Sequence, residues 1–387
     1  AMQKLQTLAA RPAVVFVTYF VCALLLGKLI VTYGPGFAII GDANKYLTIA
    51  RGLLEGTYPV VQGDILPPIY PLLLATVFLI FGVNNYAAGY IAQYLLLSGI
   101  AFFTYRIATK HLGVPALLAG LAGLAIIVWP YFNLYSLLFY SEVLYTLILS
   151  AAMYLLLEAY ARDDSRFFAG AGILIGIATL TRPVALLLPF WLVGFIVLAC
   201  LYRRQLTRWW KQIAIALTAF IITLAPWSLY VFSQTGVPTP VSTHFSSVQQ
   251  RSLNLTYEPW RDNQPVESAG IGTLVQSKLL NVVRFWNPGA GGTQAESLIE
   301  RVPLARIAIY LYYIGFLTIV ALAFLSLRFP HARTWVIYLT ILYGWSVHTV
   351  LYPYPRYTLP FIPLVLALAT YTLHQLYIRY YALRSTA

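Results

Sequence analysis

The sequence predicts an all-α polytopic membrane protein with about ten transmembrane helices. The chain has 387 residues, of which 60% are hydrophobic and only 10% are charged, whereas soluble domains are about 25% charged. Its apolar residues gather in runs of about 20, the length that a helix needs to cross the hydrocarbon core of a bilayer. Its basic residues collect in one set of loops, as the positive-inside rule requires.

The ten predicted spans follow the apolar runs along the chain. They are 12–33, 86–107, 113–131, 142–160, 166–181, 183–202, 211–232, 306–327, 334–351 and 357–378. The spans on either side of Arg182 are short and close together. Cys22 and Cys200 both lie inside apolar runs, so we interpret them as small core residues and not as a disulfide.

The segment 68–83 is apolar but short for a span, and the distribution of charge assigns its place. If it does not cross, 14 of the 25 basic residues lie on one side with three acidic residues, and 11 basic and nine acidic residues lie on the other. The first side is therefore predicted to be cytoplasmic. We expect 68–83 to be an interfacial or re-entrant helix in the first outer loop, with both termini inside.

Two large outer loops, 34–85 and 233–305, contrast with short basic cytoplasmic loops. This organisation is typical of an enzyme that acts at the outer face, whereas a transporter more often carries polar groups within its spans and paired halves. The basic loops indicate orientation and contact with anionic membrane lipids, and not nucleic-acid binding.

Two carboxylates stand beside predicted spans among apolar neighbours. Asp42 follows the first span, and Glu142 opens the fourth in Leu137-Leu-Phe-Tyr-Ser-Glu-Val-Leu-Tyr145. A partly dehydrated carboxylate at such a place is a candidate general base or cation ligand. Asp42 also precedes a helical run at 43–54, so it is equally expected to be the N-cap of that helix. The residues alone leave both alternatives open.

Two arginines are predicted at the outer ends of spans: Arg182 in Leu180-Thr-Arg-Pro-Val184, and Arg356 in Tyr352-Pro-Tyr-Pro-Arg-Tyr-Thr-Leu-Pro360. A guanidinium at the level of the lipid headgroups can bind a lipid phosphate through two parallel hydrogen bonds. Ordinary snorkelling toward phospholipid headgroups is the alternative, and the residues alone favour it. For His348, a hydrogen-bonded position in the bundle is favoured over acid–base chemistry. The sequence has no Cys/His cluster, Gly-rich phosphate loop or Gly-x-Ser-x-Gly motif that would indicate a tightly bound cofactor.

The order of several short motifs resembles that of a known superfamily. The motifs are Tyr46-Leu-Thr-Ile-Ala50, Leu54-Glu-Gly-Thr-Tyr58, Pro67-Pro-Ile-Tyr-Pro71, Phe81-Gly82, Ser141-Glu142, Gly172-Ile-Leu-Ile-Gly176, Leu180-Thr-Arg-Pro183, Ala225-Pro-Trp227 and Arg356-Tyr-Thr-Leu-Pro360. Together they resemble the GT-C superfamily of membrane glycosyltransferases over nearly the whole chain. The most similar branch contains the protein O-mannosyltransferases and the bacterial lipid A aminoarabinose transferases.

The resemblance implies an organisation and an activity. It implies a GT-C-like seven-span module at 1–232, with juxtamembrane helices in the first outer loop at 34–85. A large outer loop at 233–305 and a C-terminal three-helix transmembrane region at 306–387 follow. The implied reaction is inverting transfer of a sugar from a polyprenyl-phosphate donor to a hydroxyl of a lipid, glycan or protein acceptor. Asp42 is its acid/base, and the active site faces outward from a prokaryotic plasma membrane.

The chain departs from the family pattern at two positions. Ala43 follows Asp42 where many relatives have glutamate, so a second acid is absent or its role falls to Asp64 or Glu142. Leu66 precedes Pro-Pro where many relatives have a basic residue, so we assign the lipid phosphate to Arg356, with Arg182. His348 and Tyr357 are further candidates for the site.

The implied transfer reaction requires no metal, although Asp42 and Glu142 together are candidates to hold a divalent cation. Two other functions stay open. A carrier or flippase for lipid-linked sugars would use the same arginines but would not need Asp42. A polymerase or ligase of surface polysaccharide would share the chemistry and differ in its acceptor.

Overall fold

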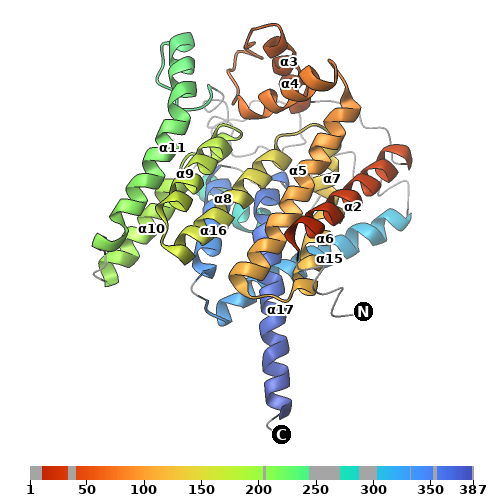
Figure 1. Cartoon of the computed structure of the whole chain (residues 1–387), viewed down its shortest axis with the longest axis vertical. Coiled ribbons are helices and arrows are strands. Elements are labelled where there is room, and N and C mark those ends of the chain that lie inside the picture. Colours follow the sequence, from red (N-terminus) through yellow and green to blue (C-terminus); the bar gives the residue numbers. More distant parts are fainter. Residues whose placement is uncertain are drawn as a thin grey trace.

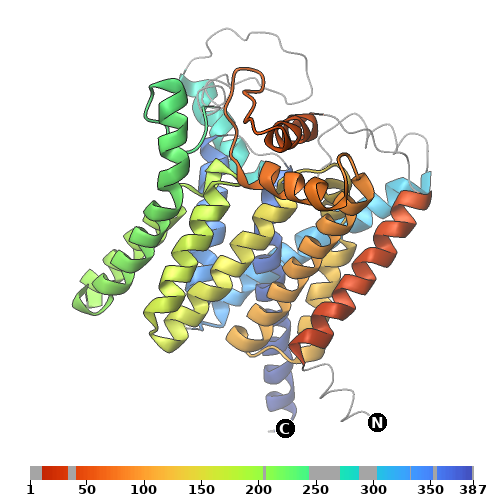
Figure 2. The same ribbon diagram turned by 45° about the horizontal axis from the view of Figure 1, so that its top comes forward.

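The computed structural model describes residues 11–33, 41–203, 206–243, 271–286, 303–331, 333–351 and 355–385. Across these residues the chain is helical, apart from turns and an isolated bridge between Val61 and Asp64. The helices form a bundle, and α3 (Asp42–Leu54) and α4 (Ile69–Phe81) lie across one end of it (Figures 1 and 2). The fold class predicted from the sequence is confirmed.

The long helices of the bundle are α2 (Pro12–Tyr33), α5 (Tyr86–Arg106), α8 (Glu142–Arg162), α11 (Leu206–Thr235), α15 (Pro303–Leu325) and α17 (Ile362–Ser385). The shorter ones are α6 (Ala116–Val128), α7 (Pro130–Leu137), α9 (Ser165–Thr179), α10 (Leu188–Arg203), α13 (Ile271–Arg284) and α16 (Thr334–Val350). Within the described ranges, six helical segments are long and apolar enough to cross a membrane. The number becomes seven if α6 and α7, bent by 45°, form one span.

A helix occupies each of the ten expected spans. However, α9, α10 and α16 have 15, 16 and 17 residues, fewer than the roughly 20 that a straight crossing needs. The number of ten spans therefore stays a prediction. Helix α4 has 13 residues, or about 20 Å of length, and lies across the end of the bundle (Figure 2). This placement agrees with the expected non-crossing segment, whereas its sidedness stays a prediction.

The first outer loop is tied to the bundle by side-chain and backbone hydrogen bonds. Arg51 at the end of α3 donates through Nε to Asn84 Oδ1 at 2.9 Å and through Nη2 to the Tyr86 hydroxyl at 3.1 Å. The Ile69 N–H at the start of α4 donates to the Leu180 carbonyl at 3.2 Å. These bonds fix α3 to the start of α5, and they fix α4 to the turn that follows α9.

Two close helix approaches position the arginine-bearing turns. A Cβ added at Gly172 would meet the Ala216 carbonyl, so this glycine lets α9 pack directly against α11, as small residues do in membrane helices. A Cβ at Gly344 of α16 would meet the ring of Phe361, the last residue of the 3₁₀ helix η4 (Pro355–Phe361). Arg182 follows α9, and Arg356 is the second residue of η4.

The predicted large outer loop, 233–305, is described only at 233–243, 271–286 and 303–305. Within it, α13 covers the end of α16: Lys278 Nζ donates to the Leu351 carbonyl at 2.9 Å, and Asn281 Nδ2 donates to the Thr349 carbonyl at 3.2 Å. These bonds satisfy carbonyls at a helix end that lack partners within the helix. The division of the chain into three regions stays a prediction.

Candidate active site

Asp42 is presented by a glycine turn. Gly41 has φ of 65°, which a residue with a side chain adopts at a cost, and it is the N-cap of α3. The start of α3 has no side-chain capping hydrogen bond, and Asp42 is its first helical residue. The carboxylate instead faces Arg356, with Oδ2 3.1 Å from Nη1. The structure therefore does not place Asp42 as the N-cap.

Glu142 is shared by both arginines. It is the first residue of α8, and its side chain is 2% exposed. Its Oε1 lies 2.7 Å from Arg182 Nη1 and 3.6 Å from Arg356 Nε. Arg182 Nη1 also donates to Ser141 Oγ at 3.3 Å. The structure thus gathers Asp42, Glu142, Arg182 and Arg356 into one cluster, which we call the ion-pair cluster.

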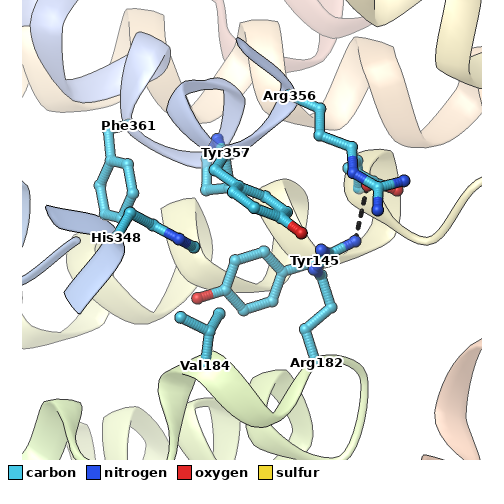
Figure 3. Close-up of a pocket in the computed structure, with 9 residues that line it drawn as sticks. Tyr145, Arg182, Val184, His348, Arg356, Tyr357 and Phe361 are labelled. Atoms are coloured by element: carbon cyan, nitrogen blue, oxygen red, sulfur yellow. Dashed lines mark ion pairs between the residues drawn. The ribbon is translucent and has the colours of Figure 1, made fainter. Parts of the chain in front are cut away.

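An aromatic stack supports the ion-pair cluster (Figure 3). The guanidinium carbons of Arg182 and Arg356 lie 5.6 and 5.4 Å from the centre of the Tyr357 ring, which is cation–π distance. Behind Tyr357, the buried ring of His348 stacks at 4.4 Å between centroids, and the Phe285 ring stacks on His348 at 5.9 Å between centroids. Tyr357 therefore lies against the two arginines, and His348 lies behind it in the lining of the same pocket.

The charges of the ion-pair cluster sum to zero when both carboxylates are ionised. Burial alone would raise the pKa of Asp42, but the positive charges of Arg356 and Arg182 hold it below its ordinary value. Burial alone would lower the pKa of Arg182, and the adjacent Glu142 carboxylate raises it instead. Asp42 is therefore ionised at neutral pH, and Arg182 stays charged.

Two pockets adjoin the cluster. The cationic pocket has a volume of about 10 Å³ and is lined by Glu142, Tyr145, Arg182, Val184, His348, Arg356, Tyr357, Pro360 and Phe361 (Figure 3). The polar pocket is open, has a volume of about 520 Å³ and is lined by Gly41, Asp42, Asn44, Lys45, Thr48, Val61 and Gln62. Arg356 lines the first and Asp42 lines the second, so their ion pair stands between the two pockets.

Comparison with known proteins identifies the fold. A sequence profile of the dolichyl-phosphate-mannose-protein mannosyltransferase family matches residues 66–230. The fold is similar to that of ArnT from Cupriavidus metallidurans. The TM-score is 0.64 for the ArnT structure bound to undecaprenyl phosphate and 0.60 for the structure in the apo state. The chain has a GT-C fold. The predicted resemblance to the membrane glycosyltransferases of this class is confirmed.

The two ArnT structures are each 16% identical to this chain, and each match covers 94% of it. The chain spans 60% of their length. No curated protein matches the chain.

Three further residues adjoin the charged side chains of the candidate site, and the sequence analysis did not name them as site residues. The Tyr46 hydroxyl lies 3.2 Å from Ser141 Oγ, and the Tyr140 ring lies 5.8 Å from the guanidinium carbon of Arg356. Tyr46 could have been found, because it lies four residues after Asp42 and residues at this spacing share a helix face. Ser141 and Tyr140 stand directly before Glu142 in the sequence, but their contacts with Tyr46 and Arg356 join segments far apart in the chain, which the sequence does not indicate.

Asp64, the other candidate second acid, binds a different element. Its Oδ1 accepts a hydrogen bond from Thr243 Oγ1 at 3.2 Å, which ties the first outer loop to the start of the second. Its predicted role in chemistry stays a prediction. Among the residues that the structure describes, no group of three or more His, Cys, Asp or Glu side chains could hold a metal ion.

Proposed function

We propose that this GT-C protein transfers a sugar from a polyprenyl-phosphate donor to an acceptor hydroxyl at the outer face of the membrane. Transfer inverts the anomeric configuration, and Asp42 is the general base. The observation that carries the proposal is the Asp42–Arg356 ion pair between the cationic and the polar pocket. It puts a carboxylate that can accept a proton beside a guanidinium that can bind a phosphate.

The proposed reaction is one displacement. The acceptor oxygen attacks the anomeric carbon while the bond from that carbon to the phosphate oxygen breaks. Asp42 takes the acceptor proton. The donor is a phosphodiester with one negative charge, and the released polyprenyl phosphate carries a second. Arg356 and Arg182 would stabilise this new charge as it develops.

The two pockets suit the two substrates. The cationic pocket offers planar guanidinium groups, which bind phosphate oxygens in pairs. A polyprenyl-linked donor is supported by the similarity to ArnT, which was solved with undecaprenyl phosphate. The polar pocket presents the side chains of Asn44, Lys45 and Thr48 beside Asp42, which suits a hydroxyl-bearing lipid, glycan or protein acceptor.

The test is product formation by the purified protein in proteoliposomes. The donors are undecaprenyl phosphates that carry mannose or aminoarabinose, and a cell-envelope extract supplies acceptors. We expect released undecaprenyl phosphate and a glycosylated acceptor whose anomeric configuration, measured by NMR, is opposite to that of the donor. A carrier or flippase would move the donor between leaflets with no covalent product. A polymerase or ligase would extend or attach a polysaccharide.

The outer-face placement has a separate test. We expect Asn84→Cys, which lies between α4 and α5, to react with an impermeant thiol reagent added outside intact cells. Reaction only from the cytoplasmic side would contradict the proposed orientation.

A further inference from the structure

We infer that Arg356 is exchanged between Asp42 and the donor phosphate, so that binding of the phosphate frees the Asp42 carboxylate to act as a base. This inference rests on the proposed function and adds a coupling between the two pockets. Without donor, the base is held in an ion pair. With donor, the guanidinium is drawn toward the phosphate and the carboxylate turns to the acceptor.

The two arginines are held unequally. Arg182 Nη1 contacts Glu142 at 2.7 Å and Ser141 at 3.3 Å, and both partners are buried. Arg356 divides its guanidinium between Asp42 at 3.1 Å and Glu142 at the longer distance of 3.6 Å. Arg182 is therefore anchored, and Arg356 is the member of the cluster with two competing carboxylates.

The size of the cationic pocket indicates that a side chain must move. Its volume of about 10 Å³ is about that needed for one water molecule, which is too small for a phosphate group. Tyr357 is fixed by its stack on His348. The Asp42–Arg356 pair is more accessible than the Arg182–Glu142 pair, because Asp42 is 38% exposed and Glu142 only 2%. Its contact is the one that a phosphate can most readily replace.

The charge balance of the transfer step favours the same exchange. As the acceptor proton moves to Asp42, that side chain becomes neutral. The electron pair of the breaking carbon–oxygen bond moves to the phosphate oxygen, so the phosphate gains one negative charge. The total charge of the site does not change, but one negative charge passes from one side of Arg356 to the other. A guanidinium between the two groups stabilises the charge in both positions.

The test measures the affinity of the protein in nanodiscs for undecaprenyl phosphate. Asp42→Asn removes the competing charge and resembles the protonated base. We expect it to bind at least about 5-fold more tightly than wild type, as for coupled sites generally. In the Arg356→Ala background the same change should have no such effect, because the shared guanidinium is gone. Thermal unfolding of each variant reports whether it is folded.

Glu55→Gln is the matched control, because it removes one carboxylate from the other end of α3, where the residue is exposed. We expect no change in affinity for this variant, since a distant exposed charge is screened. If Arg356→Ala weakens binding but Asp42→Asn does not tighten it, the exchange is wrong and the phosphate role of Arg356 stands. If Arg356→Ala binds as wild type does, the phosphate assignment in the proposed function is wrong, and the exchange fails with it.

Discussion

Helix α8 carries two buried glutamates, Glu142 at its first residue and Glu158 near its end, about 24 Å apart along the helix. Each side chain is 2% exposed, and each contacts more than one basic residue. The ion pairs around Glu142 and those around Glu158 are therefore of the same kind. Their basic partners differ in how far they are exposed and in where they lie in the chain.

Glu158 is held by neighbours that reach water. Its partners are Lys110, Arg162 at 2.8 Å one helical turn away, and His111 at 3.3 Å. The Lys110 and Arg162 side chains are 36% and 55% exposed. Glu142 is held by Arg182 and Arg356, which are 18% and 22% exposed and line the cationic pocket. The comparison teaches that an ion pair becomes a candidate site where its cations are withdrawn from water beside a pocket.

The largest effect is expected from Glu142→Gln. This change leaves Arg182 without its nearest carboxylate in a mostly buried position, and breaking a buried pair costs about 3–5 kcal/mol. We expect a lower unfolding temperature in nanodiscs together with loss of sugar transfer, because the phosphate-binding arginines lose their common anchor. A stable Glu142→Gln protein that transfers sugar at the wild-type rate would show that the ion pairs of Glu142, like those of Glu158, are not needed for transfer.

Substitution of Arg356 should have the next largest effect. Arg356→Ala removes a charge-assisted contact with the phosphate, and hydrogen bonds to charged groups contribute about 1.5–3 kcal/mol. Arg356→Lys keeps the charge but loses the planar pair of donors, so it should also weaken binding of undecaprenyl phosphate and transfer, to a smaller extent. A lysine variant equal to wild type would identify Arg356 as an ordinary headgroup anchor.

Glu158→Gln should affect only stability. Lys110 and Arg162 can turn to water when the carboxylate is lost, so the expected cost is about 1 kcal/mol. Transfer should stay at the wild-type rate, because these residues lie at the other end of α8 from the candidate site. Equal loss of transfer in Glu158→Gln and Glu142→Gln would show that both clusters act only through the fold.

The smallest expected effect is a shift of the pH dependence. In the wild type, the arginines hold the pKa of Asp42 below its ordinary value near 4, so the carboxylate stays ionised as the pH falls from 7 to 5. In Arg356→Ala, Arg356 no longer lowers the pKa of Asp42, whereas burial still raises it. The acid limb of the residual transfer rate should therefore move to higher pH. Coincident acid limbs in both proteins would exclude a titrating Asp42 beside Arg356.

Much of the fold followed from local properties of the sequence. Apolar runs and the charges at their ends predicted a helix at every expected span, and the short apolar run at 68–83 with the charge distribution predicted α4. The number of crossings did not follow. Helices α9, α10 and α16 are shorter than a straight span, and length alone cannot decide how such helices cross.

The members of the site were predicted better than their partners. Charged residues are rare in this chain, so Asp42, Glu142, Arg182 and Arg356 were each conspicuous. Their pairing depends on how η4 and the turn after α9 approach α3 and α8. In spans that are apolar on all sides, periodicity does not indicate which faces meet. The aromatic neighbours were harder still, because 30 tyrosines offer too many candidates.

The most direct test of the central claim compares turnover with binding in Asp42→Asn. Asparagine keeps the size of the side chain and removes the proton acceptor, so transfer from an undecaprenyl-phosphate sugar should fall by at least about 10²-fold. Binding of undecaprenyl phosphate should tighten, because the arginines are unchanged and the competing carboxylate charge is gone. Full transfer by a folded Asp42→Asn protein would contradict the account, since the site would then transfer sugar without its proposed base.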